Sequence, residues 1–219
     1  MQDPVRRHPT RAEQLDLLVS IVAEQAVDGD RLLDLGCGQG YLAHLLLARH
    51  AGLVYVGADR STAALDQARA NLAPQVDRVR LVPADLDVID AAGLPVGPYR
   101  FIVAALVFHD LSHAAKARVI GWAARQLTRD GFFLLYDRIR LAESALFPLQ
   151  RAIWRRLQRL HGEAMREAAD FVAYQADLGP DNNPARLVDY AEWFRAAGLA
   201  GGLLHLHGNV ALIAGAPAT

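Results

Sequence analysis

The sequence predicts an α/β fold built on a doubly wound, mostly parallel sheet of seven strands. Three observations lead to this prediction. Short apolar runs alternate with helical patterns, a glycine-rich loop follows the first of these runs, and no internal repeat or low-complexity linker interrupts the order. The chain has 219 residues, of which 53% are hydrophobic and 21% charged, which is enough to bury one core. We therefore expect a single domain over residues 1–219.

The first half of the chain alternates between helix and strand. Residues 11–25 place Leu15, Leu18 and Val22 at helical spacing, and the apolar run at 31–35 predicts the first strand. The elements expected next, in order, are a helix at 41–49, a strand at 53–58, a helix at 62–71 and strands at 79–82 and 100–106. Ser61 is a suitable N-cap for the helix at 62–71.

The second half begins with the same rhythm and then departs from it. A helix at 114–127, a turn at Asp130–Gly131 and a strand at 132–136 are expected. After Asp137 the sequence is helical and contains no strand pattern, which predicts a helical cap insertion at about 138–184 over one edge of the sheet. A helix at 184–197 follows, and two short strands within 202–214 flank the turn signal Gly208-Asn209.

Composition excludes several functional classes. The net charge of −1 excludes a globally basic nucleic-acid binder, so no DNA partner is expected. Cys37 is the single cysteine, which excludes a disulfide framework and a multi-cysteine metal site. The N-terminus lacks an apolar leader and no run of 18 apolar residues occurs, so we expect a cytoplasmic protein without a membrane partner. Of the 23 basic residues, Lys116 is the only lysine.

The most informative local pattern is the sequence LLDLGCGQG at residues 32–40, between a predicted strand and a predicted helix. Ligands bind at this position in doubly wound sheets, and glycines allow them to approach the backbone. Tyr41 occupies the position where a dinucleotide fingerprint requires its last glycine. Asp34, inside the strand, would repel a pyrophosphate but would suit an ammonium group. The alternative interpretation is a purely structural turn.

Two further acids follow the next strands of the predicted sheet. Asp59 ends the second strand, where a carboxylate can accept hydrogen bonds from both hydroxyls of a ribose. Asp85 ends the third strand and can accept a hydrogen bond from an adenine amino group while Leu86 packs on the ring. A helix-capping role is the alternative for Asp85. Together with Asp34, these acids present three strand ends to one nucleoside ligand.

On these residues the sequence resembles the class I S-adenosylmethionine-dependent methyltransferases, which have a Rossmann-like fold. The stretches that carry the resemblance are LLDLGCGQG, VGADRS, PADL, YRFIVAALVFHDL, LTRDGFFLLYD and AEWFRAAGL, and they span about residues 30–214. Arg100 and Arg129-Asp130 depart from the family pattern at the edges of elements.

The resemblance implies S-adenosylmethionine as the cofactor. It places Asp34, Gly36 and Gly38 at the methionine moiety and Ala104 near the sulfonium. Asp59 falls on the ribose, and Asp85 and Leu86 fall on the adenine. Cys37 and Arg60 adjoin these motifs and complete the expected cofactor site, with Cys37 expected to pack in the loop rather than act as a nucleophile.

The candidate catalytic residue is His109, in the Phe108-His109-Asp110 stretch that follows the fourth strand. Histidine titrates near neutrality and can serve as a general base, although a structural or positioning role is equally compatible with this place in the family. No Asn-Pro-Pro-Tyr, Asp-Pro-Pro-Tyr or Pro-Cys motif occurs, which argues against the amino-methylating and pyrimidine C5-methylating classes. Ala104-Ala105 replaces the acids of metal-dependent relatives, so no metal is expected.

The predicted cap carries the candidate substrate residues. Arg151 and Arg155, with Arg159, recur every fourth residue. Tyr174 is expected either to close over the pocket or to pack as a core tyrosine. The arginine stripe would bind an acidic substrate if the cap acts as a lid, and it would be a solvated helix face or a membrane-surface helix otherwise. We expect methylation of a small-molecule metabolite, with tRNA modification or a non-methylating cyclisation as alternatives. The sequence is compatible with a homodimer.

Overall fold

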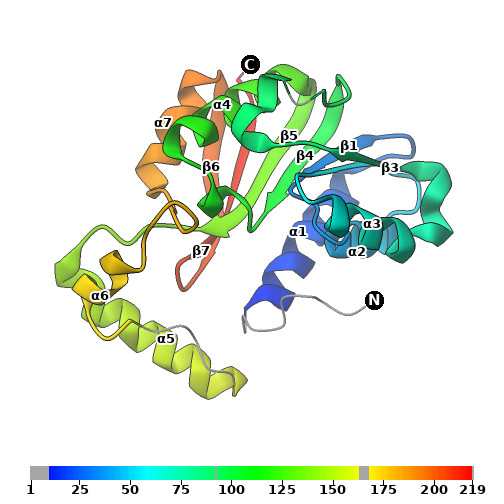
Figure 1. Ribbon diagram of the computed structural model, residues 1–219. Coiled ribbons are helices and arrows are strands. Elements are labelled where there is room, and N and C mark those ends of the chain that lie inside the picture. The colour runs from blue at the N-terminus through cyan, green and yellow to red at the C-terminus, as the bar shows by residue number, and fades with distance from the viewer. Residues whose placement is uncertain (1–9, 92, 163–167, 219) are drawn as a thin grey trace.

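The computed structural model describes residues 10–91, 93–162 and 168–218 (Figure 1). Its centre is a seven-stranded sheet of order β3-β2-β1-β4-β5-β7-β6. The strands are β1 (Arg31–Leu35), β2 (Val54–Asp59), β3 (Val79–Pro83), β4 (Tyr99–Ala105), β5 (Leu127–Arg138), β6 (Leu199–His207) and β7 (Val210–Pro217). β7 runs antiparallel to both of its neighbours, and the other pairs are parallel. The predicted mostly parallel seven-stranded sheet is therefore confirmed.

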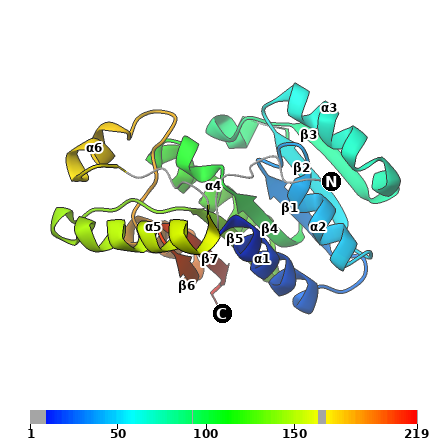
Figure 2. The same cartoon turned by 90° about the horizontal axis from the view of Figure 1, so that it is seen from below.

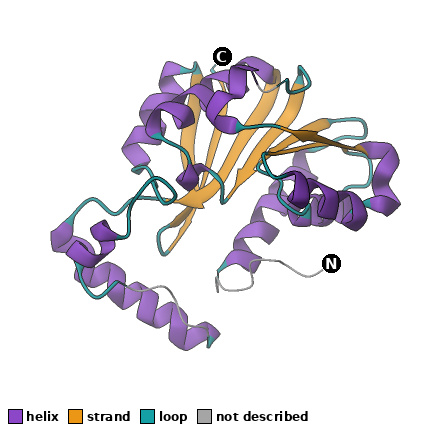
Figure 3. Cartoon of the chain, in the orientation of Figure 1, coloured by secondary structure: helices purple, strands orange, loops and turns teal. Residues whose placement is uncertain are grey.

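Helices cover both faces of the sheet (Figure 3). One apolar cluster joins α4 (His113–Gln126) and α7 (Leu187–Ala196) to one face. A second cluster joins α1 (Arg11–Gln25), α2 (Tyr41–Arg49) and α3 (Thr62–Asn71) to the other. β1 and β4 lie at the middle of the sheet and are buried on both faces, which explains why their sequences are almost continuously apolar. Two further helices are α5 (Phe147–His161) and α6 (Phe171–Ala176).

β5 differs from the sequence prediction at its start. The composition of Asp130–Gly131 predicts a turn, but both residues belong to the strand. The register is irregular here, because Tyr99 pairs with Leu127 whereas Phe101 pairs with Phe132. A Cβ added at Gly131 would lie 3.0 Å from the carbonyl oxygen of Tyr99, so glycine lets the irregular strand stay close to β4.

The helical stretch expected at about 138–184 contains α5 and α6, which extend beyond the end of the sheet where β5 finishes (Figures 1 and 2). α5 packs on the turn between β6 and β7, where the indole Nε1 of Trp154 donates to Oδ1 of Asn209 at 3.2 Å. Part of the stretch, residues 163–167, lies outside the described residues. Its role as a cap over a ligand stays a prediction. Over the described ranges, no helix has the length and apolar character needed to cross a membrane.

Candidate cofactor and active site

A pocket of about 220 Å³ lies at the carboxyl ends of the four neighbouring strands β3, β2, β1 and β4. Chain connections leave β1 and β4 in opposite directions here, which is the position where ligands bind in doubly wound sheets. The residues that line it come from the ends of these strands and the turns that follow: Gly36, Asp59, Arg60, Ala84, Asp85, Leu86, Asp87, Leu106, Val107, Asp110 and Leu111.

The glycine-rich loop is held against β2 and against the turn after β4. The backbone N–H groups of Gly36 and Cys37 both donate to the carbonyl oxygen of Ala58, at 2.7 and 3.0 Å. Gly36 has a φ of +77°, and a Cβ added there would lie 2.5 Å from Cγ2 of Val107. A side chain at this position would therefore be strained and would push into the pocket wall.

Asp59 joins the glycine loop to the pocket. Its Oδ2 accepts a hydrogen bond from the Gly38 N–H at 2.8 Å, and its Oδ1 accepts one from the Ser61 N–H at 2.8 Å. These two bonds fix the orientation of the carboxylate. Since each carboxylate oxygen can accept more than one hydrogen bond, both retain capacity for the two hydroxyls of a ribose.

The far wall of the pocket suits an adenine ring. Leu86 is 5% exposed and presents apolar surface, and the neighbouring Asp85 is exposed. The Asp87 N–H donates to Oδ1 of Asp85 at 2.9 Å, which orients this second carboxylate. Arg60 is exposed and also lines the pocket. The carboxylates of Asp59 and Asp85 are hydrogen-bond acceptors, and with the apolar Leu86 they fit the hydroxyl and amino donors and the ring of a nucleoside.

Asp34 does not line this pocket; its side chain is buried in the sheet. The Tyr55 hydroxyl donates to Oδ2 of Asp34 at 2.6 Å. Burial raises the pKa of Asp34 to about 7, and the nearby charge of Asp59 adds to the rise, while the Tyr55 hydrogen bond opposes it. Cys37 is buried beside this pair, and burial raises the pKa of its thiol. A thiol of raised pKa stays protonated at neutral pH and is a poor nucleophile.

Residues of the turn after β4 line the pocket but were not predicted from the sequence. Ala104 is expected near the sulfonium, and its side chain is completely buried in the apolar cluster that joins the sheet to α4 and α7. The pocket is lined by Leu106 and Val107 instead, because the chain leaves the sheet only after Ala105. Leu106 has a φ of +56°, an uncommon value for a branched side chain. Nothing in the sequence marks this conformation.

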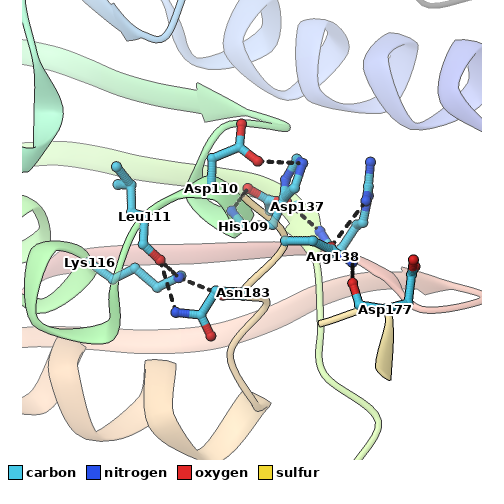
Figure 4. A network of polar contacts seen from close by, with 9 residues as sticks. His109, Asp110, Leu111, Lys116, Asp137, Arg138, Asp177 and Asn183 are labelled. Atoms are coloured by element: carbon cyan, nitrogen blue, oxygen red, sulfur yellow. Dashed lines mark hydrogen bonds and ion pairs between the residues drawn. The ribbon is translucent and has the colours of Figure 1, made fainter. Parts of the chain in front are cut away.

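His109 is held by a carboxylate on each side (Figure 4). Its Nδ1 lies 2.7 Å from Oδ1 of Asp137, and its backbone N–H donates to the other oxygen of Asp137 at 3.1 Å. Its Nε2 lies 3.4 Å from Oδ1 of Asp110. Asp110 lines the pocket, whereas His109 is 7% exposed and lies behind it. Sequence reasoning missed Asp137, for which the signal was an acid at the end of the apolar run FFLLY.

Lys116, the only lysine, is buried beneath the same loop (Figure 4). Its ammonium donates to the carbonyl oxygens of Leu111 and of Asn183, the latter at 2.6 Å. The Asn183 N–H in turn donates to the carbonyl oxygen of His109 at 2.6 Å. Lys116 and Asn183 therefore connect the pocket loop to the segment that precedes α7. Burial lowers the pKa of Lys116 to about 8, against the opposing effect of Asp137 and other acids.

Replacing Lys116 with methionine is expected to remove a pH-dependent part of the stability. The pKa of this ammonium is about 8 in the folded chain and 10.5 as a free side chain. Between these two values the unfolded chain binds a proton that the folded chain has released, so the free energy of unfolding due to Lys116 rises with pH. Below about pH 8 the ammonium is charged in both the folded and the unfolded chain, so folding carries the full free-energy cost of burying this charge.

The measurement is denaturant unfolding of both proteins at about pH 7 and about pH 10. The wild type should gain stability relative to Lys116→Met between the two values, and the comparison cancels the titration of groups common to both. Parallel pH dependences would show that Lys116 keeps an ordinary pKa.

The structure does not bring the candidate substrate residues to the pocket. Arg151 and Arg155 lie on α5, and Tyr174 lies on α6. The Tyr174 hydroxyl accepts a hydrogen bond from the Leu141 N–H at 3.0 Å, and its ring packs on Phe147 with centroids 5.7 Å apart. Tyr174 thus holds α5 and α6 together. Among the described residues, no three histidine, cysteine or acidic side chains are grouped to hold a metal ion.

Residues 32–131 match the family model described as a methyltransferase domain. The chain is 34% identical over 143 residues to ribosomal RNA small subunit methyltransferase A of Anaeromyxobacter dehalogenans (strain 2CP-C), an alignment that covers 65% of this chain and 45% of that protein. The chain therefore spans about half the length of the curated relatives it matches.

Two solved structures show the same fold. An O-methyltransferase family protein from Burkholderia thailandensis matches with a TM-score of 0.67 and 20% identity, over 94% of this chain and 57% of that one. A mitomycin 7-O-methyltransferase matches with a TM-score of 0.62 and 18% identity, over 94% and 55% of the two chains.

The matched segment contains the glycine loop, Asp59, Asp85 and the His109 loop. The sequence match, the strand order and a pocket that fits a nucleoside agree with one another. Residues 32–131 therefore carry a methyltransferase domain, and the chain has the fold of solved methyltransferases.

Proposed function

We propose that this protein transfers a methyl group from S-adenosylmethionine to a small organic acceptor. The observation that carries the proposal is the pocket in which Asp59, Asp85 and Leu86 meet the glycine loop of a methyltransferase domain. Asp59 would hold the ribose hydroxyls, and Asp85 and Leu86 the adenine. The Gly36–Gly38 backbone would face the methionine part.

The cofactor supplies an activated methyl group and its own leaving group. What this chain must add is alignment of the acceptor with the methyl carbon and, for some acceptors, removal of a proton. The pair of His109 and Asp137 suits proton removal, because a buried carboxylate on Nδ1 leaves the lone pair of neutral imidazole on Nε2. Nε2 faces Asp110, which lines the pocket. A proton that leaves the acceptor would therefore pass Asp110 on its way to His109.

A small acceptor is favoured by the overall charge of the chain. A net charge of −1 gives little general attraction to the phosphate backbone of RNA. The name of one structural neighbour, a mitomycin 7-O-methyltransferase, also describes a small acceptor. RNA is the second candidate, because relatives at 34% and 31% identity are named as ribosomal RNA and tRNA methyltransferases.

The test is a product assay with S-adenosylmethionine that carries a labelled methyl group. The purified chain is incubated with a panel of phenols, carboxylic acids and amines, and separately with ribosomal RNA and tRNA. Label in an organic product supports the proposal, and label in the nucleic-acid fraction supports the second candidate. Consumption of the cofactor with an unlabelled, rearranged product would indicate the non-methylating alternative. A folded chain that does not bind S-adenosylmethionine would contradict all three.

A further inference from the structure

A second pocket, of about 320 Å³, shares no lining residue with the cofactor pocket. Four segments that are distant in sequence form it: the start of α4, the chain after β5, α6 and the start of α7. Its lining residues are mostly polar, namely His113, Arg140, Leu141, Ala142, Gln175, Arg186 and Asp189. The function proposed above does not require any of them.

The basic side chains in this pocket differ in their partners. The Arg186 guanidinium is paired with Asp189, with Nη2 at 2.6 Å from Oδ1, so this pair contributes no net charge. Arg140 is half-buried, and within the described ranges its guanidinium has no hydrogen bond or ion pair. The pocket therefore contains a positive charge that lacks a counter-ion among the described residues, which favours an anionic ligand.

His113 adds a second unused polar group. Its Nε2 is buried and has no hydrogen-bond partner among the described residues. The ring contacts the backbone of Pro184 through a hydrogen bond and packs edge-on against Trp193, with centroids 5.5 Å apart. Since Nδ1 is the nitrogen left to donate to Pro184, Nε2 carries a proton only in the charged imidazolium. Burial lowers the pKa of His113, as do Lys116 and Arg140, while Asp189 opposes them.

We propose that this pocket binds the carboxylate or phosphate group of a small organic ligand between Arg140 and His113. The guanidinium offers paired donors to the anion, and the imidazolium offers its otherwise unpaired Nε2–H. The bound anion supplies the partner that each side chain lacks. It is the counter-charge for Arg140 and the hydrogen-bond acceptor for His113. The charged form of His113 is stabilised when the anion is bound, so binding takes up a proton at this ring.

Titration calorimetry tests the site with inorganic phosphate and, separately, acetate as probes. Each titration is run near pH 7 in two buffers of different ionisation enthalpy, which reveals proton uptake. We expect saturable binding with uptake of protons, and the tighter of the two probes identifies the anion class. Arg140→Gln should weaken binding by about tenfold or more, the usual effect of losing a charge-assisted hydrogen bond. Arg195→Gln, which changes an exposed arginine of α7, should bind as the wild type does.

His113→Asn separates the two parts of the proposal. This variant should retain weaker binding but lose the proton uptake, a change that loss of packing alone would not produce. The proposal would be overturned by absence of saturable binding of either probe to the wild type. Equal affinity of Arg140→Gln and Arg195→Gln would overturn it as well. Neither outcome depends on whether the protein transfers a methyl group.

Discussion

Replacing His109 with asparagine is expected to lower turnover by roughly 10² or more when the acceptor is an alcohol or an ammonium group. An alcohol must lose its proton as it attacks the methyl carbon, and an ammonium group must lose one before its nitrogen can attack. A positioned general base usually contributes about 10²–10⁴-fold. The 2.7 Å contact between Nδ1 and Asp137 orients the ring and leaves Nε2 for the proton. Asparagine preserves a polar side chain of modest size but cannot accept a proton near neutral pH.

The measurement is the turnover number and its pH dependence, with cofactor affinity determined in parallel. The acidic limb of the pH–rate profile should disappear in His109→Asn while cofactor binding is kept. His161→Asn, which changes an exposed histidine at the end of α5, is the matched control and should behave as the wild type does.

A carboxylate acceptor changes the expected result. It is already ionised at neutral pH and needs no base, so the same substitution should then cost little beyond packing. The two carboxylates around His109 equally suit a ring that only positions the loop. Full turnover of an alcohol acceptor in His109→Asn would therefore assign His109 a purely positioning role.

Replacing Asp59 with alanine is expected to weaken S-adenosylmethionine binding by at least about tenfold, or ~1.4 kcal/mol. Two effects add here. The substitution removes the acceptor proposed for the ribose hydroxyls, and it frees the Gly38 N–H that Asp59 holds at 2.8 Å. Loss of a hydrogen bond to a charged group costs about 1.5–3 kcal/mol in general, so tenfold is the lower bound.

Calorimetric titration of the folded variant with S-adenosylmethionine measures this effect. Asp77→Ala, at an exposed acid between α3 and β3, is the matched control and should bind normally. Unchanged affinity of Asp59→Ala, with an unchanged thermal unfolding profile, would mean that the cofactor binds elsewhere.

Local pattern explains why most of the sheet could be predicted. Strands in the middle of a parallel sheet are buried on both faces, so β1 and β4 appear in the sequence as mostly apolar runs. The acids that follow β2 and β3 can be grouped from their positions in the chain, because parallel strands end at the same edge of a sheet. Asp59 and Asp85 do line one pocket.

The same reasoning was wrong where an irregular backbone intervened. The Asp130–Gly131 pair has the composition of a turn, but it lies in an irregular part of β5 between Leu127 and Phe132, which both pair with β4. The side chain of Ala104, the position expected near the sulfonium, is buried, and the side chains that line the pocket after β4 are those that follow the left-handed turn at Leu106. Both differences arise from backbone conformations that depend on a neighbouring strand rather than on the local residues.

The sequence by itself therefore determined the order of the strands and helices along the chain, the glycine loop and the carboxylates at the strand ends. Only the tertiary structure decided which distant groups meet. Asp137 lies 28 residues from His109, and Asn183 lies 67 residues from Lys116, yet each pair is in contact. The pocket around Arg140 is assembled from four separate segments. The periodicity of apolar residues indicates which face of a helix or strand is buried. The partner of a buried polar group depends instead on how whole helices and strands pack against one another.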